Sequence, residues 1–330
     1  MERFKIIVLL IWSMMICNDL YSQEKDSITA PKLVENVSRS PYKAFTLSER
    51  IELTQPLSIQ LTQLGSYKCI SDKYGYSMPD MQVNQFFQAK IKANLNIMRS
   101  RRYALNSILG YSYISGKISN IHNALVERNE YNYLYTGVSF TYFSVLLNKI
   151  MVYNSTVIVD GSEKRIERVK GLVSGTMVLK ADKDTRMTVG VIINIDPLTN
   201  MPILPTFSYK HIFKNGFETD IVLPQSIYLR RKLFQKGRIS LGAEMDQTTF
   251  YLYNVEGVKQ ACQYGQLNIN AVLAYEQLLN DRVSFSVKSG IRQAEFGRII
   301  KKNSSYSRPI SKIEYDPAFY INLGISFRPF

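Results

Sequence analysis

The sequence lacks a long hydrophobic run beyond its first residues. After residue 22, no stretch approaches eighteen consecutive apolar residues, which excludes transmembrane helices from that part of the chain. The apolar run from Ile6 to Cys17 follows a positively charged start and is too short to span a bilayer. It predicts a secretory signal peptide over residues 1–22, cleaved after Ser22, and therefore export.

Cysteine is scarce as well, with three residues in the whole chain. Acylation of Cys17 in a lipoprotein is an alternative, although the Met-Met-Ile before it lacks the small residues that such processing prefers. Removal of the signal peptide leaves Cys69 and Cys262, an even number in an oxidising compartment. We expect both in loops on the outer side, where one disulfide between them is an alternative to two free thiols.

Histidine is limited to His122 and His211, which leaves little for acid–base chemistry. We expect His122 in an outer loop without an orienting partner and His211 near the periplasmic end of its strand. The chain also lacks metal-ligand spacing, a glycine-rich phosphate loop and a CxxC motif. The sequence therefore predicts a protein that is not an enzyme, with no catalytic residue, no metal site and no cofactor.

Acidic residues are too few to balance the basic ones. There are 41 lysines and arginines against 27 acids, for a net charge of +14. Such an excess predicts an anionic partner, and for an exported chain lipopolysaccharide phosphates fit better than nucleic acid. A basic surface that is only solvated is an equal alternative.

What the chain does have is a period-two alternation of apolar and polar residues from about residue 57 onwards. Residues 87–97 show it: Phe87, Ile91 and Leu95 share one face with other apolar residues, and polar residues occupy the opposite face. This pattern is typical of strands with one oily and one wet face. Since many segments reach ten or more residues and carry basic residues in mid-strand, a transmembrane barrel fits better than a soluble sandwich.

Residues 57–330 are predicted to form an all-β, antiparallel transmembrane β-barrel of fourteen strands, with twelve as the alternative. The strands are expected at residues 57–68, 83–98, 102–116, 131–145, 149–160, 169–181, 185–196, 202–213, 216–223, 226–234, 238–254, 264–278, 281–295 and 317–330. Short connections alternate with longer ones, as in barrels that have short periplasmic turns and long outer loops. Pro224-Gln225 is the exception, a very short turn on the outer side.

Residues 23–56 have no clean periodicity and contain three prolines. They predict a periplasmic leader after the signal peptide, with a plug that lies in the lumen as the alternative.

The last twelve residues alternate as a closing strand would. Phe319, Ile321, Leu323, Ile325 and Phe327 would face lipid, with polar residues and glycine facing the lumen. The segment resembles the C-terminal insertion signal of bacterial outer-membrane barrels, carried here by Asn322, Gly324, Phe327 and Phe330. The resemblance implies recognition by the barrel-assembly machinery. Pro329 departs from the pattern, since an aromatic residue is usual there.

Several segments resemble an uncharacterised family of outer-membrane β-barrel proteins of Bacteroidetes-type bacteria. They are residues 203–209 (ILPTFSY), 220–224 (DIVLP), 227–230 (IYLR), 239–244 (ISLGAE) and 324–329 (GISFRP). The resemblance implies the fold and an outer-membrane location, and it brings no activity with it.

Polar residues on the wet faces are the candidate functional residues. We expect them to face the lumen: Lys90, Lys92, Asn94, Arg230, Glu244, Asn268, Asn270 and Lys288. Charges such as Glu244 and Lys288 would either select solutes or form ion pairs that only stabilise the wall.

Two functions follow from these expectations. One is a channel or transport protein for small solutes. The other is a plugged, non-conducting interaction barrel whose basic outer loops bind lipopolysaccharide or a partner, through residues such as Arg298, Lys301, Lys302, Arg308 and Lys312. The sequence does not indicate an oligomeric state.

Overall fold

The computed structural model describes residues 55–73, 76–120, 126–196, 199, 202–255, 260–302, 304 and 308–328. All regular structure in these residues is β-strand. Accordingly, no helix in the described part of the chain is long and apolar enough to cross a membrane. The predicted signal peptide, almost all of the leader, His122 and Phe330 lie outside the described residues.

The strands, numbered along the chain, are β1 (Leu57–Leu64), β2 (Tyr67–Lys73), β3 (Tyr76–Ser77), β4 (Met81–Arg99), β5 (Tyr103–Asn120), β6 (Val126–Leu146), β7 (Lys149–Gly161), β8 (Ile166–Ala181), β9 (Thr185–Ile195), β10 (Ile203–Ile212), β11 (Phe217–Leu223), β12 (Ser226–Leu233), β13 (Gly237–Leu252), β14 (Cys262–Asn280), β15 (Val283–Lys301), β16 (Ser311–Tyr315) and β17 (Ala318–Phe327).

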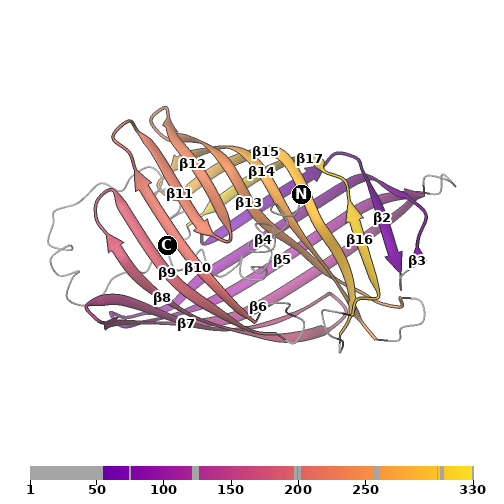
Figure 1. The fold of residues 1–330 in the computed structure, drawn as a ribbon, viewed down its shortest axis with the longest axis horizontal. Helices are drawn as coiled ribbons and strands as arrows, with labels where there is room; N and C mark the ends of the chain where they lie inside the picture. The colour runs from indigo at the N-terminus through magenta and orange to yellow at the C-terminus, as the bar shows by residue number, and fades with distance from the viewer. Residues whose placement is uncertain are drawn as a thin grey trace, which may run out of the picture.

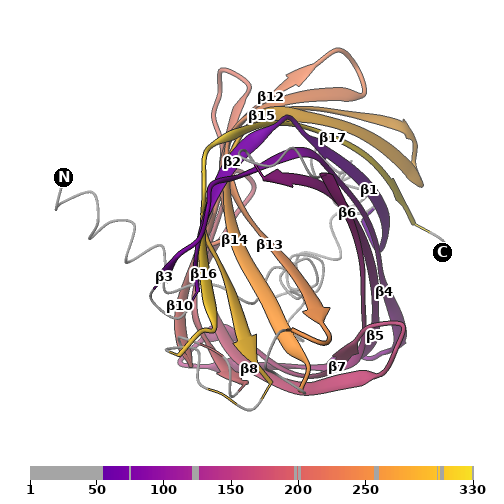
Figure 2. The same ribbon diagram turned by 90° about the vertical axis from the view of Figure 1, so that its right-hand side faces the viewer.

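Together these strands form one closed antiparallel barrel of fourteen wall strands (Figures 1 and 2). Closure comes from β1 and β17, which pair from Leu57 opposite Phe327 to Leu64 opposite Tyr320. The pairs β1/β2 and β16/β17 each act as one interrupted wall strand, and β3 adds two residues beside β2. The predicted fold class and strand number are therefore confirmed.

The inner and outer faces alternate as the sequence predicts. On β17, Ile321, Leu323 and Ile325 are 43–52% exposed, whereas Tyr320 and Asn322 are 1% and 7% exposed. Apolar side chains on an exposed outer face suit a lipid environment, because no water is there to penalise them. The outward-facing assignment of the closing strand is thus confirmed for Phe319, Ile321, Leu323, Ile325 and Phe327.

Short and long connections lie at opposite ends of the barrel. The end that holds the first residue of β1 and the last of β17, here called the turn end, has six connections of two to four residues, at 100–102, 147–148, 182–184, 213–216, 234–236 and 281–282. The opposite end, here called the loop end, holds the other connections between wall strands. One of them is the predicted short turn at Pro224-Gln225, between β11 and β12.

Several predicted outer loops are largely strand. β5 and β6 extend to Asn120 and from Val126, and β15 extends to Lys301, with β16 pairing beyond it. Arg298 and Lys301 therefore lie on β15 and Lys312 on β16, rather than in a loop. The backbone of these extensions is paired even where both faces of the strand are polar. Because apolar and polar residues do not alternate there, the sequence does not show these parts as strands.

The cysteines are also placed on strands. Cys69 lies in β2, between Tyr315 of β16 and Met81 of β4, and Cys262 begins β14 opposite Leu252 and Lys301. Both are buried free thiols, so they do not form the disulfide weighed from the sequence. Ladder pairing with different strands fixes each cysteine in its own part of the wall.

Two neighbouring wall strands are interrupted at one level. Between β1 and β2 the inward positions change from even numbers, such as Thr62 and Leu64, to odd ones, such as Cys69 and Ser71. Between β16 and β17 they change from odd to even numbers, across Asp316-Pro317. The prediction treated 57–68 as one strand and began the last strand at 317, because a change of phase shortens the visible alternation.

The height of the wall is uneven. β4, β14 and β15 have 19 residues each, whereas β11 has 7 and β12 has 8. About nine to eleven residues suffice to cross a bilayer. The long strands therefore extend well beyond the membrane at the loop end, while the wall formed by β9 to β12 ends early.

Gly242 provides a test of the close packing between β12 and β13. It lies opposite Tyr228, and a Cβ there would overlap the Ile227 carbonyl oxygen. We expect Gly242→Ala to lower the free energy of unfolding by about 1–3 kcal/mol, measured by urea unfolding in detergent. Gly265→Ala is the control, because a Cβ at Gly265 meets nothing within 4 Å. Equal stability of both variants would contradict this packing.

Candidate functional site

The loop-end half of β13 is the most unusual part of the lumen. β13 pairs with β12 only as far as Glu244, whereas its pairing with β14 continues to Leu252. Beyond Glu244 the alternation of buried and exposed residues breaks down, and Met245, Phe250 and Tyr251 are all buried. Figure 2 shows this part of β13 and β14 inside the outline of the barrel, and β13 contacts β6, which is not its neighbour in the sheet. The sheet thus turns inward here and crosses the lumen.

Aromatic rings fix this crossing. The ring of Phe250 stacks on Tyr131 of β6, with centroids 4.1 Å apart, and on Tyr264 of β14 at 4.5 Å. Ile114 of β5 completes a buried cluster with Phe250 and Tyr264. Each buried aromatic ring removes a large apolar area from water. The contacts therefore hold the β13–β14 hairpin against β5 and β6.

Asp160 of β7 is the polar centre of the crossing. Its carboxylate accepts hydrogen bonds from Tyr133 of β6 and Tyr251 of β13, both at 2.7 Å. Lys170 of β8 forms an ion pair with the same carboxylate. Asp160 is 2% exposed, so a charge that would be costly alone is paired and hydrogen-bonded.

Glu167 of β8 connects the crossing to residues at the loop end. It pairs with Arg165 at 2.6 Å and with Lys302 at 3.0 Å, and it accepts a hydrogen bond from the Tyr253 hydroxyl at 3.0 Å. Lys302, which is predicted to be one of the basic outer-loop residues that bind lipopolysaccharide or a partner, instead forms an ion pair with Glu167. Arg168, the residue after Glu167, contacts Gln263 of β14 and Asp196.

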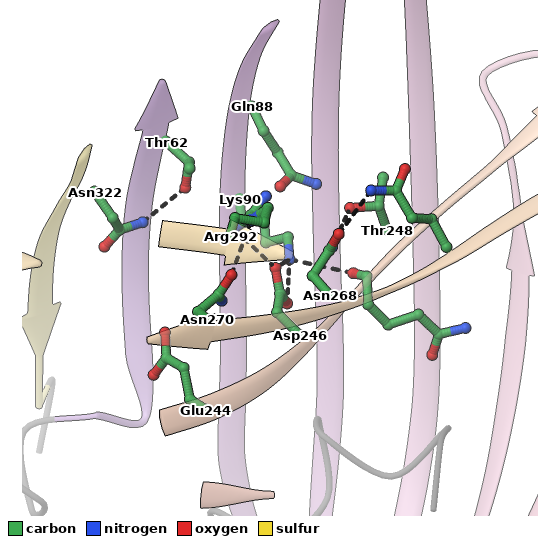
Figure 3. Close-up of polar contacts among 12 residues, drawn as sticks. Thr62, Gln88, Lys90, Glu244, Asp246, Thr248, Asn268, Asn270, Arg292 and Asn322 are labelled. Carbon is green, nitrogen blue, oxygen red and sulfur yellow. Dashed lines mark hydrogen bonds and ion pairs between the residues drawn. The ribbon is translucent and has the colours of Figure 1, made fainter. Parts of the chain in front are cut away.

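A second network lies deeper in the lumen, around Asp246 (Figure 3). Lys90 of β4 donates to Asp246 of β13 at 2.6 Å, although several strands separate β4 from β13 in the sheet. Arg292 of β15 lies 3.5 Å from the same carboxylate and donates to Asn270 at 2.9 Å. The Lys90–Asp246 pair therefore joins opposite walls of the barrel.

Other predicted lumen charges are paired in the same way. Lys288 lies 2.6 Å from Glu244, which also accepts a hydrogen bond from Tyr228 at 2.5 Å. Arg230 lies 2.9 Å from Asp220 on the neighbouring strand. These contacts support the interpretation that the charges stabilise the wall.

The neutral candidates also face inward. Asn268 donates to Thr248 at 3.2 Å, and Asn322 of the predicted insertion signal donates to Thr62 at 2.7 Å (Figure 3). Gly324 lies beside Ser286 and Gln60, and Phe327 is outside. Lys92 and Asn94 follow Lys90 at two-residue steps along β4.

Apart from Glu244, the sequence did not single out the acids and tyrosines that bind these bases. Asp246, Asp220 and Asp160 are visible only as polar residues on wet faces. Their signal was the presence of an acid on a predicted inward face, but the partner comes from another strand, up to 156 positions away for Lys90 and Asp246.

His211 contacts side chains of its own strand and of the neighbouring strand β9. Its Nδ1 lies 2.8 Å from the Thr185 hydroxyl, at the turn end of β10, and its ring packs between those of Tyr209 and Phe213. Within the described residues, His, Cys, Asp and Glu side chains form no group of three that could hold a metal ion.

No family model matches the chain, and no curated protein matches it. It is similar to the transport unit of the autotransporter AIDA-I from Escherichia coli, with a TM-score of 0.33, 11% identity, and coverage of 83% of this chain and 90% of that one. It is also similar to an outer-membrane channel from Pseudomonas putida F1, with a TM-score of 0.32, 8% identity, and coverage of 87% and 98%.

At these TM-scores the likeness carries no argument about what the chain does. The architecture rests on the strand pairing and the apolar outer face of the chain itself. On those grounds the protein is a transmembrane β-barrel of the outer-membrane type.

The Lys90–Asp246 pair provides a test of the cross-lumen network. Lys90→Met or Asp246→Leu alone leaves a largely buried charge without its main partner and should lower the free energy of unfolding by about 3–5 kcal/mol. The double variant should cost clearly less than the sum, since neither charge then remains. Urea unfolding in detergent measures both.

The matched control for this cycle is the exposed pair Arg128–Glu130, with side chains 62% and 46% exposed. Its removal by Arg128→Met should cost about 1 kcal/mol or less. Purely additive effects of the Lys90 and Asp246 substitutions would contradict a direct pair across the lumen.

Proposed function

We propose that this protein is a non-conducting outer-membrane barrel that presents an interaction platform outside the membrane. The observation that carries the proposal is the crossing of the lumen by the loop-end half of β13. Contacts from Phe250 and Tyr251 join it to β6 and β7, across the space through which a solute would pass. The paired lumen charges support the same conclusion, because ion-paired bases offer little free charge to select anions.

The unequal lengths of the wall strands support the proposal of a platform outside the membrane. β4, β5, β6, β14 and β15 have 18–21 residues, so their loop-end parts stand outside the bilayer as a paired sheet. A hydrogen-bonded sheet holds its side chains more rigidly than loops do. Exposed basic residues at this end include Arg128, Lys301, Arg308 and Lys312.

Lipopolysaccharide phosphates are the partner we propose for these bases, because they are the anionic groups of the outer leaflet. The proposed location is the outer membrane, after export by the signal peptide and insertion by the barrel-assembly machinery. Membership in the Bacteroidetes-type family named above remains part of this proposal, and so does the absence of enzymatic activity.

A channel for small solutes is the second candidate. It is favoured by the small polar side chains that β6 to β8 present to the lumen, among them Ser139, Thr156 and Thr176. Conductance distinguishes the two functions.

Conductance in planar bilayers should be absent or very low for the wild type, because the crossing blocks the lumen. Replacing Tyr131 and Phe250 by alanine removes the stacked rings and should produce discrete current steps. The control is Tyr103→Ala with Phe140→Ala, which removes an aromatic pair from the exposed outer face. Large, stable wild-type steps would refute a closed barrel and favour the channel.

Lipopolysaccharide binding depends in this proposal on the bases at the loop end. A basic residue near an anionic lipid surface contributes about 1 kcal/mol. Replacing Arg308 and Lys312 by glutamine should therefore weaken binding of fluorescent lipopolysaccharide to the detergent-folded protein by about thirtyfold at low salt, and by less at high salt. Lys183→Gln with Lys214→Gln, at the turn end, is the control. Equal losses for both pairs would contradict a loop-end site.

A further inference from the structure

The apolar band on the outer face of the barrel differs in height from strand to strand. On β6, exposed apolar side chains extend from Leu134 to Leu146, twelve residues further along the chain. Along β10 they extend over ten residues, from Ile203 to Phe213. With a rise of about 3.3 Å per residue and a strand tilt of about 40°, these bands are about 30 Å and about 25 Å high. Both match the apolar layer of about 25 Å that surrounds outer-membrane barrels.

The band on β11 is much shorter. Its outward side chains extend only from Phe217 to Leu223, six residues further along, while the buried side chains of Glu218 and Asp220 face the lumen. Six residues correspond to about 20 Å along the strand and about 15 Å in height. This part of the wall is therefore about 10 Å too short for the apolar layer.

The neighbouring strand β12 shows where the short band ends on the turn side. Ile227 and Leu229 are 47% and 45% exposed, and Arg231 follows on the same face, with its guanidinium 4.9 Å from the ring centroid of Phe217 on β11. A long basic side chain on an aromatic ring is typical of a membrane–water border, because its stem lies among apolar groups while its charge reaches water.

At the loop end, the border of this part of the wall is the turn at Pro224-Gln225. The Gln225 carbonyl accepts a hydrogen bond from the Met245 N–H at 2.8 Å, so β13 is joined to the wall up to this position. Beyond it β13 turns into the lumen, and no strand among the described residues continues the wall above β11 and β12. A bilayer matches a short apolar wall by becoming thinner beside it, at a modest cost in free energy.

We propose that β11, β12 and residues 237–245 of β13, here called the short sector, form a lipid-binding surface that thins the membrane locally. The headgroups of the lipids at the loop end descend there to Pro224-Gln225, about 10 Å below their level beside β6 or β10. The inference goes beyond the proposed function, because it concerns the outer face of the barrel and holds whether or not the lumen conducts.

The exposed side chains favour lipid over a protein partner as the cover of the short sector. Ile227, Leu229 and Leu241 are 47%, 45% and 62% exposed, comparable to Leu134 at 40% on the tall wall of β6. The short sector thus continues the aliphatic outer face and differs from it in height. Protein interfaces concentrate aromatic residues and arginine at their centre, whereas here Arg231 lies at the turn-end edge.

Tryptophan depth in lipid vesicles tests the thinning. The only tryptophan of the chain, Trp12, lies in the predicted signal peptide, so the chain without residues 1–22 offers a background free of tryptophan. Phe217→Trp and Leu223→Trp place a single tryptophan at either border of the short sector. Leu134→Trp and Leu146→Trp are the matched controls on β6. Each variant is refolded into phosphatidylcholine vesicles, and folding is verified by heat-modifiable migration.

The measured quantity is the quenching of tryptophan fluorescence by lipids brominated close to the headgroup, relative to lipids brominated close to the end of the acyl chain. We expect the shallow bromines to quench more strongly at all four positions, because each position then lies at a border of the apolar layer.

Stronger quenching by the deep bromines at position 217 or 223 would overturn the proposal, since a layer of full thickness must bury one end of a wall about 15 Å high. Loss of quenching at position 134 or 146 would also overturn it, because the thinning would then surround the whole barrel instead of the short sector.

Discussion

The requirement that every strand edge in a membrane protein be paired or covered governs this structure. In lipid, an unpaired backbone edge costs several kcal/mol per group, which is why β1 must meet β17. The same requirement acts on β13, whose partner β12 begins only at Ser226, opposite Glu244. Beyond that point the edge of β13 turns away from lipid into the lumen. There the Gln247 carbonyl accepts a hydrogen bond from Lys90, and side chains of β6 and β7 contact the strand.

The charges of the chain are distributed according to the same geometry. Inside, bases and acids meet across the lumen or between neighbouring strands, as Lys90 and Asp246 or Arg230 and Asp220 do. In surroundings of low dielectric constant an unpaired charge would be expensive, so pairing is the condition for burial. Exposed bases such as Arg308 and Lys312 lie at the loop end instead. A large positive net charge is thus compatible with an interior made of ion pairs.

The uneven wall links the closure of the lumen to the platform outside the membrane. Because β12 ends opposite Glu244, the loop-end part of β13 has no partner on that side and leans over the lumen together with β14. The extensions of β4, β5 and β6 provide the opposite surface, with Ile114 and Tyr131 contacting the β13–β14 hairpin. One difference in strand length therefore accounts both for a crossing that blocks the lumen and for a rigid sheet that stands above the bilayer.

The sequence by itself determined the local features of this protein: the period-two strands, the short turns at one end, the outward-facing alternate residues from Phe319 to Phe327 and the split at Pro224-Gln225. These depend on alternation and turn chemistry within a few residues. Only the tertiary structure decided the partners of Lys90, Glu244 and Arg230, the change of phase between β1 and β2, and the extension of strands through predicted loops. The physical reason is that a wet face looks the same in sequence whether it meets water or the opposite wall. The curvature of the closed sheet decides whether a given wet face meets water or the opposite wall.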